Sequence, residues 1–502
     1  MQFTTVYFAV FFIIVFTVYW FVLRKSVQAQ NSLLLVASYA FYAWWDWRFL
    51  GLIVFTSIVT FFTAKHANGS IGKYLTVASI TVNLGILFAF KYFGFFADSF
   101  GLLLASLGIG VNRVVTDIAL PVGISFYTFQ CIAYSVDVYR KKVAPCSCLL
   151  TFCLFVAYFP QLVAGPIERA SQLLPQLTSK RNWRDDYAAS GLRMVLFGVM
   201  KKLCVADMLA PLCQWAFDDI GNPLFAVKGG IYFSLQIYLD FSAYSEIARG
   251  TSRLLGIELM ANFRFPYFSR NIVEFWSRWH ISLLWWFRDY VYIPLGGSRK
   301  GSYRTAFNIV AVFVLSGLWH GAAWNFVAWG VFWAVAYVVG KMLVKMTKPD
   351  GPIEFGHLPQ MIATMWVVAF GFYIFRCNDF QHLLLGAKSV GHYTAFFGVL
   401  WLAAKLMVFV RARWRRLFTV LAAMCCLMAA ALVVSKWQSM LYFWWVAVLL
   451  LVVAMEWKNR NCDYAVQHIS RHRCVRWAFY WICIANIILS EPLDMGFIYF
   501  QF

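Results

Sequence analysis

The sequence contains little charge, and little acid in particular. Of its 502 residues, 13% are charged and 62% are hydrophobic, and only 22 are Asp or Glu. A typical soluble domain is about 25% charged and about 45–50% apolar. No polar stretch is long enough to form a soluble domain by itself. These shortages exclude an ordinary soluble enzyme, a disordered chain and a disulfide-stapled secreted scaffold, and they predict an all-α, polytopic membrane protein.

The sequence also lacks familiar catalytic and metal-binding motifs. It contains no Walker A, GxSxG or HExxH motif, so nucleotide-driven pumping and serine or zinc hydrolysis have no support. Its 12 cysteines do not form the paired CxxC spacing of a zinc site, and several lie within apolar segments. We therefore predict no disulfide framework, no metal and no permanently bound cofactor.

Basic residues outnumber acidic ones, 43 Lys and Arg against 22 Asp and Glu, which gives a formal net charge of +21. They fall in short clusters between apolar runs, such as residues 24–25, 140–142 and 411–416, and these clusters alternate with weakly basic connections. This alternation is typical of cytoplasmic membrane loops. It predicts a lipid bilayer as the surroundings and excludes nucleic acid as a partner.

The apolar runs predict about 11 membrane crossings in a single domain, residues 1–502, because some runs are shorter than the roughly 20 residues that a perpendicular helix needs. The first run, residues 3–23, is followed rather than preceded by basic residues, which predicts an external N-terminus instead of a signal peptide. Residues 160–202 contain prolines and charges and are predicted to be re-entrant or interfacial. Further apolar runs occupy residues 32–45, 49–64, 74–96, 119–138, 149–165, 192–212, 225–247, 305–340, 361–375, 393–410, 417–434, 441–454 and 475–490.

His320 is the strongest candidate for chemistry, because ionisable residues inside apolar segments are costly and are therefore functional candidates. No Asp, Glu, Lys or Arg lies between Arg304 and Lys341. A continuous helix through that gap would be about 50 Å long, so it must tilt strongly or break within an apolar layer of about 30 Å. Gly317 and Gly321 flank His320 and would admit a close neighbour. Burial would keep the imidazole neutral, as a general base requires. A purely structural interhelical hydrogen bond fits the residues equally well.

His280 is the second candidate, and a weaker one. It lies in an aromatic-rich segment in which Glu274 and Arg278 have the i,i+4 spacing of a helical ion pair. Such a segment is typical of the headgroup boundary or of a wet cavity. Taken alone, the segment favours an interfacial histidine over a catalytic one.

Other polar residues in apolar surroundings predict structural pairing between helices rather than catalysis. They are Gln236, Asp240, Glu246 and Arg249.

At these residues the chain resembles the membrane-bound O-acyltransferase family, in particular its bacterial alginate O-acetylase-like branch. The resemblance covers nearly the whole chain, with core motifs in residues 119–340 and additional helices in residues 361–490. The matching stretches, in family order, are PVGISFYTFQ (121–130), QLVAGPIER (161–169), YLDFSAYSEIA (238–248), FWSRWHISL (275–283), FRDYVYIPLGG (287–297), WHG (319–321) and FIYFQF (497–502).

The resemblance implies a helical funnel in the bacterial inner membrane that brings a cytoplasmic acyl thioester, expected to be acetyl-CoA, and an outer acceptor to one buried centre. The family's histidines fall on His320 and His280, which gives His320 the role of general base. The implied function is O-acetylation of an exopolysaccharide such as alginate, together with periplasmic acetyltransferase partners and the polysaccharide machinery.

Two alternatives remain open. One is the related transfer of D-alanine to teichoic acid. The other is a transporter or proton-coupled channel in which His320 and His280 form a relay, since intramembrane histidines suit that role as well.

Overall fold

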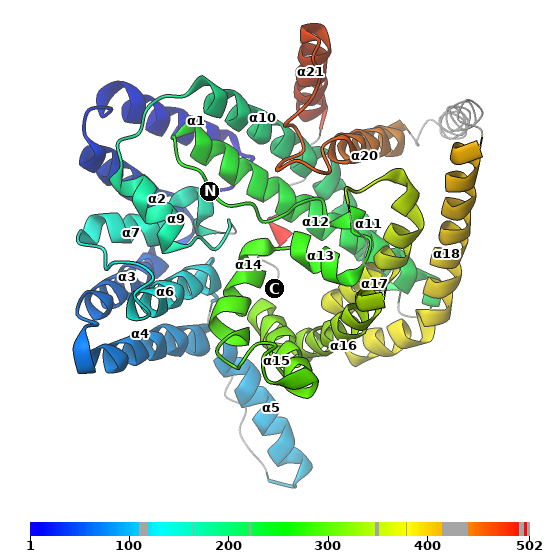
Figure 1. Cartoon of the computed structure of the whole chain (residues 1–502), viewed down its shortest axis with the longest axis horizontal. Helices are drawn as coiled ribbons and strands as arrows, with labels where there is room; N and C mark the ends of the chain where they lie inside the picture. The colour runs from blue at the N-terminus through cyan, green and yellow to red at the C-terminus, as the bar shows by residue number, and fades with distance from the viewer. Residues whose placement is uncertain are drawn as a thin grey trace.

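The computed structural model describes residues 1–109, 119–163, 165–219, 222–346, 351–377, 379–413, 440–490 and 496–498. Within these ranges the chain forms helices joined by turns and loops, and it forms no strand. The all-α prediction is therefore confirmed for the described residues. In Figure 1 the helices form a broad ring around the short helices α13 (Ile272–Arg278) and α14 (Ile281–Phe287), and the C-terminus is marked close to them.

The apolar runs of the first third of the chain become helices that begin at polar caps. The Thr5 side chain accepts a hydrogen bond from the Phe8 amide at the start of α1, and Ser26 accepts one from the Ala29 amide at the start of α2. The helices of this part are α1 (Val6–Thr17), α2 (Val27–Asp46), α3 (Leu50–Lys65), α4 (Gly72–Leu87), α5 (Phe93–Ser106), α6 (Ile124–Tyr139) and α7 (Leu149–Ala157).

The middle of the chain contains residues 160–202, the segment that the sequence predicts to be re-entrant or interfacial. Its first part folds into two helices, α8 (Phe159–Leu162) and α9 (Ala170–Thr178), which are both too short to cross an apolar layer of about 30 Å. Three longer helices follow: α10 (Asp185–Lys201), α11 (Asp207–Asp218) and α12 (Pro223–Leu254). The 32-residue helix α12 packs against α10, α11 and α17 and is the central element of the fold.

The last part of the chain places short helices beside long ones. The remaining described helices are α13 (Ile272–Arg278), α14 (Ile281–Phe287), α15 (Gly301–His320), α16 (Trp324–Met346), α17 (Leu358–Arg376), α18 (Phe380–Arg413), α20 (Met440–Lys458) and α21 (Arg473–Leu489).

Five helical segments among the described residues are long and apolar enough to cross a membrane, so the predicted total of about 11 stays a prediction. The run at 417–434 lies outside the described residues. The five segments are Val27–Lys65, Gly69–Ser106, Trp324–Val344, Phe355–Arg376 and Gln381–Phe409.

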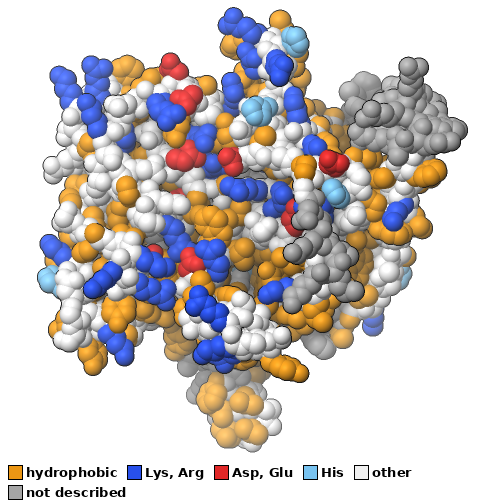
Figure 2. All heavy atoms as spheres, viewed as in Figure 1, with side chains coloured by type: hydrophobic (Ala, Val, Ile, Leu, Met, Phe, Trp, Pro, Cys, Tyr) orange, Lys and Arg blue, Asp and Glu red, His pale blue; other side chains and the backbone are white. Residues whose placement is uncertain are grey.

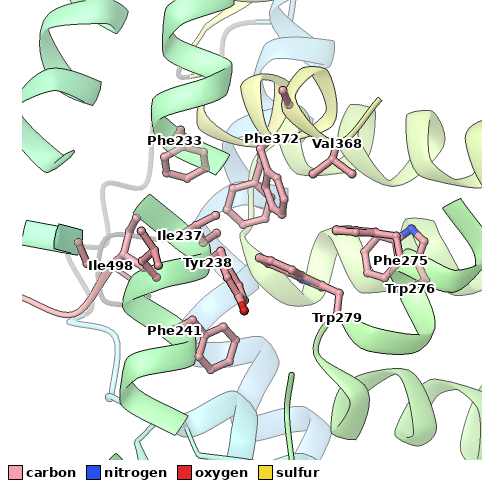
Figure 3. Packing of buried hydrophobic residues seen from close by; sticks show 14 of the residues in the cluster. Phe233, Ile237, Tyr238, Phe241, Phe275, Trp276, Trp279, Val368, Phe372 and Ile498 are labelled. Carbon is pink, nitrogen blue, oxygen red and sulfur yellow. The ribbon is translucent and has the colours of Figure 1, made fainter. Parts of the chain in front are cut away.

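Aromatic side chains from distant helices fill the centre of the molecule. Figure 3 shows Phe233 and Tyr238 of α12 beside Phe372 of α17 and beside Trp279, which follows α13. The rings of Trp279 and Phe372 lie 4.9 Å apart, and those of Tyr238 and Trp279 lie 6.1 Å apart. Because Trp279 directly precedes His280, this packing fixes the backbone on which the second candidate histidine lies.

Candidate active site

The apolar segment 305–340, which the sequence predicts either to tilt strongly or to break, breaks directly after His320. Helix α15 ends at His320, and α16 begins at Trp324. The two helices then pack against each other along their length. A Cβ atom on Gly317 would collide with the backbone carbonyl of Phe326, and one on Gly321 would collide with the Phe326 ring. The glycines therefore admit a close neighbour, as their spacing predicts.

His320 is buried at the end of its helix, with 7% of the residue exposed. Its ring centroid lies 4.9 Å from that of Trp319, 5.1 Å from that of Trp329 and 5.3 Å from that of Phe375, each in an edge-on arrangement. These rings come from α15, α16 and α17. The surroundings of the imidazole are thus largely apolar, which disfavours its charged form.

His280 is also buried, with 2% of the residue exposed, rather than lying at the surface of the molecule. It precedes α14 in the left-handed region of the backbone, with φ 42° and ψ 54°. A non-glycine residue in that region costs on the order of 1–3 kcal/mol and needs surrounding structure to hold it. Part of that support is the Ile281 amide, which donates to the Asn262 carbonyl at 2.9 Å.

The two histidines line the same cavity, which has a volume of about 390 Å³. The Trp319 ring contacts both, because its centroid also lies 6.0 Å from that of His280. Arg288 and Lys341 add positive charge to a wall that is otherwise mostly aromatic and aliphatic. Ligand cavities of about 300–1,000 Å³ typically combine apolar walls with a few polar groups in this way.

A second, smaller cavity of about 100 Å³ also reaches His320. Its lining includes Trp45, Lys91, Ser125 and Trp319. Among the described residues, His320 is the one that lines both this cavity and the larger one. A single imidazole therefore lies between two separate spaces.

Lys91 and Tyr92 hold the last turn of α15, and neither residue was identified from the sequence. The Lys91 ammonium donates to the carbonyls of Trp319 at 2.6 Å and His320 at 3.0 Å, and the Tyr92 hydroxyl donates to the carbonyl of Leu318 at 2.9 Å. These carbonyls lack partners within the helix, and a cation at a helix C-terminus is favourable. The sequence does mark Lys91 as a functional candidate, because it is an ionisable residue within the apolar run 74–96.

Lys91 and Tyr92 share one π-helical turn, Phe88–Tyr92, between α4 and α5. Single π-helical turns occur frequently at functional sites.

The predicted structural pairing is confirmed for the acidic residues of α12. Lys202 lies 2.9 Å from Asp240, and Lys201 lies 3.0 Å from Glu246. Each lysine also contacts a second carboxylate, Asp207 in one case and Glu456 in the other. We refer to these six side chains as the ionic cluster.

Arg249 and the predicted helical pair of Glu274 and Arg278 also have ionic partners. Arg249 pairs with Glu258 at 3.1 Å. The helical pair of Glu274 and Arg278 forms at 3.0 Å, and Arg270 binds the same carboxylate. Burial alone would raise the pKa of Glu274, but the hydrogen bonds from Arg270 and the positive charge of Arg278 outweigh it, so the pKa is lowered. Among the described residues, no group of three or more His, Cys, Asp or Glu is arranged to hold a metal ion.

Comparison with known proteins identifies relatives over most of the chain. The sequence profile of the membrane-bound O-acyltransferase family matches residues 144–386. "Probable alginate O-acetylase AlgI" of Azotobacter vinelandii is 37% identical over 369 residues, which is 71% of each chain. "Peptidoglycan O-acetyltransferase" of Helicobacter pylori is 32% identical over 407 residues, 73% of this chain and 75% of the relative.

A more distant relative is "Teichoic acid D-alanyltransferase" of Bacillus subtilis, which is 30% identical over 282 residues, 52% of this chain and 69% of the relative. The similarity to the alginate and peptidoglycan enzymes covers more of this chain, at higher identity. The apolar helices of the structure agree with the membrane-bound character that the family description gives. This chain therefore belongs to the membrane-bound O-acyltransferase family and is a multi-pass membrane O-acyltransferase.

Proposed function

We propose that this enzyme transfers an acetyl group from a cytoplasmic thioester, acetyl-CoA, towards an exopolysaccharide such as alginate, with His320 as the general base. The observation that carries the proposal is the position of His320 between two cavities with different linings. A transferase that works across a membrane needs one group that can meet a donor from one side and an acceptor from the other.

The larger cavity suits the donor. Arg288 and Lys341 in its lining can pair with the phosphates of a coenzyme, and the apolar wall can surround the thioester. Lys341 also begins a basic cluster that the alternation of charge assigns to the cytoplasm. The donor would therefore enter from the cytoplasmic side.

The smaller cavity suits the acceptor. Trp45 and Leu120 in its lining adjoin the weakly basic connections at residues 46–48 and 98–117, which the same alternation assigns to the outside. A hydroxyl group that enters here would reach the imidazole of His320 from the side opposite the donor.

In the transfer step, a neutral nitrogen of His320 takes the proton of the acceptor hydroxyl while the hydroxyl oxygen attacks the thioester carbonyl carbon. The new C–O bond forms, the C–S bond breaks, and the thiolate leaves with the proton that His320 returns. His280 orients the acceptor or stabilises the developing charge. The aromatic walls exclude water and so limit hydrolysis of the thioester.

The acceptor class follows from the names of the relatives, which describe alginate and peptidoglycan O-acetylation. We place the enzyme in the bacterial inner membrane, where periplasmic acetyltransferase partners would pass the group on to the polysaccharide. Transfer of D-alanine to teichoic acid remains the second candidate, because the Bacillus subtilis relative carries that name.

The test is transfer of radiolabel from acetyl-CoA in membranes that also contain the cell's polysaccharide machinery. His320→Ala should lower transfer by about 10²–10⁴-fold, because general-base catalysis contributes that much. His280→Ala should lower it less. His66→Ala is the matched control, because this histidine is exposed and lies outside both cavities, so it should keep full transfer.

Each alternative has its own result. Full transfer by inserted His320→Ala would contradict the assignment of the base. Failure of the wild type with acetyl-CoA, but success with a D-alanyl carrier, would favour the teichoic acid reaction. Proton flux in liposomes without any acyl donor would favour the relay.

A further inference from the structure

A third large cavity, far from the histidines in the sequence, lies where helix α1 ends. It has a volume of about 830 Å³ and is formed by the π-helical turn Val18–Val22, the residues after it, and the connection between α9 and α10. Its lining combines cations with aromatic rings and contains no carboxylate. The lining residues are Phe16, Trp20, Phe21, Arg24, Lys25, Lys180, Arg181, Asn182 and Trp183.

The positive charge of this cavity is not neutralised by any carboxylate that the structure describes. Within the part of the chain that the structure describes, none of the four cations forms an ion pair. Arg24, Lys25 and Lys180 are exposed and can turn towards a ligand, whereas Arg181 is buried. Four cations that converge on one space create a field that attracts an anion.

Arg181 is the most informative of the four, because only 6% of it is exposed. It donates to the Tyr19 hydroxyl at 2.8 Å, to the Leu177 carbonyl at 2.9 Å and to the side-chain oxygen of Asn31. All three acceptors are neutral, so the guanidinium is held in place without a counter-charge from the described residues. A buried charge without a counter-charge is costly, and an anion in the adjoining cavity would lower that cost.

The cavity lies where an apolar surface changes to a charged one. Phe21 and Val22 are 77% and 68% exposed at the end of an apolar helix, and the exposed Arg24 and Lys25 follow. Trp183 stands edge-on to Trp20 at 5.5 Å between ring centroids. Tryptophan rings and basic residues gather in this way at the level of lipid headgroups. Figure 2 shows Lys and Arg side chains together at the corner of the molecule where α1 lies in Figure 1.

We propose that this cavity binds the headgroup phosphate of an anionic phospholipid of the cytoplasmic leaflet, such as phosphatidylglycerol. The four cations surround the phosphate, the indole rings lie at headgroup level, and the acyl chains follow the exposed apolar side of α1. The bound lipid would tie α1 to the connection between α9 and α10. The proposal does not depend on the acyl-transfer reaction.

The test compares two charge-matched triple variants of the full-length protein in detergent. The site variant is Arg24→Gln with Lys25→Gln and Lys180→Gln, three exposed positions that leave the buried Arg181 intact. The control is Lys65→Gln, Lys73→Gln and Lys142→Gln, which are also exposed and lie outside this cavity. Native mass spectrometry would measure binding of dioleoyl-phosphatidylglycerol, with dioleoyl-phosphatidylcholine and inorganic phosphate as the other ligands.

We expect the site variant to bind phosphatidylglycerol about 100-fold more weakly than the wild type, because each basic residue contributes on the order of fivefold to binding of an acidic lipid. The control variant should bind as the wild type does, and phosphatidylcholine should bind weakly to all three proteins. Equal losses in both variants, or no loss in the site variant, would overturn the proposal. Inorganic phosphate that binds as tightly as the lipid would also overturn it, because the site would then take a free anion.

Discussion

Two buried regions of this protein differ in the partners of their lysines. In the ionic cluster, Lys201 and Lys202 each contact two carboxylates at 2.7–3.1 Å. Beside His320, Lys91 donates to two backbone carbonyls and lies 3.5 Å from the Ser125 hydroxyl, and it forms no ion pair with any described residue. Both regions are surrounded by aromatic and aliphatic side chains.

The difference shows which positive charges are neutralised within the scaffold and which are not. The ionic cluster joins α10, α12 and α20, and each of its two lysines is neutralised by two carboxylates. Lys91 instead lines the smaller cavity, where it meets the carbonyl dipoles at the end of α15 and the Ser125 hydroxyl. Its amino group therefore lies in the space that we assign to the acceptor.

The largest expected effect on folding comes from breaking the ionic cluster. Lys201→Met leaves Glu246 and Glu456 buried together without their shared cation. Removing one member of a buried ion pair typically destabilises a protein by about 3–5 kcal/mol. Denaturant unfolding in detergent micelles should show this loss. Arg184→Gln is the control, because its pair with Asp186 is exposed to solvent, and the variant should unfold as the wild type does. If Lys201→Met leaves the stability unchanged, the ionic cluster does not stabilise the fold, and the contrast with the region beside His320 fails.

The next effect is on catalysis and concerns Lys91, beside His320. Lys91→Met removes the cation that holds the carbonyls of Trp319 and His320, so the imidazole should shift from its productive position. A displacement of about 1 Å can cost on the order of 100-fold in rate. We expect kcat for acetyl transfer to fall about 10- to 100-fold while the KM for the donor changes little.

The control for Lys91 separates positioning from general disruption. Lys91→Arg keeps a cationic donor and should restore part of the rate, whereas Lys73→Met changes an exposed lysine of the same segment and should have no effect. A fall in rate that Lys91→Arg does not relieve would mean that this residue does not act through its charge.

The smallest effect concerns Glu274, whose arginine partners leave it partly accessible. Its pKa is lowered in the folded protein, so it adds stability above the unfolded pKa of about 4.3, and that stability is lost as the pH falls through the folded pKa. Glu274→Gln should therefore cost about 1.5 kcal/mol at neutral pH, and its difference from the wild type should shrink below about pH 4. The free energy of unfolding of both proteins, measured as a function of pH, checks the direction of this change. A difference that grows towards low pH would contradict the lowered pKa.

Local sequence features predicted some parts of the site and not others. The break beside His320 was predictable, because a charge-free gap too long for one perpendicular crossing must tilt or break. The pairing of Asp240 and Glu246 was predictable in kind, since buried carboxylates need partners, but Lys201 and Lys202 were not identified as those partners. Lys91 was missed, because a single lysine hardly lowers the hydropathy of a long apolar run.

The sequence by itself determined that this protein is an all-α membrane protein, since composition and the alternation of apolar and basic segments depend on local chemistry. It also made His320 the strongest candidate, because an ionisable side chain in a long apolar stretch is energetically costly and is therefore a functional candidate. Only the tertiary structure decided that His280, 320 − 280 = 40 residues earlier, lines the same cavity, and that Lys91 holds carbonyls up to 229 residues away. Such contacts depend on how helices pack against one another, and no periodicity within one segment records that packing.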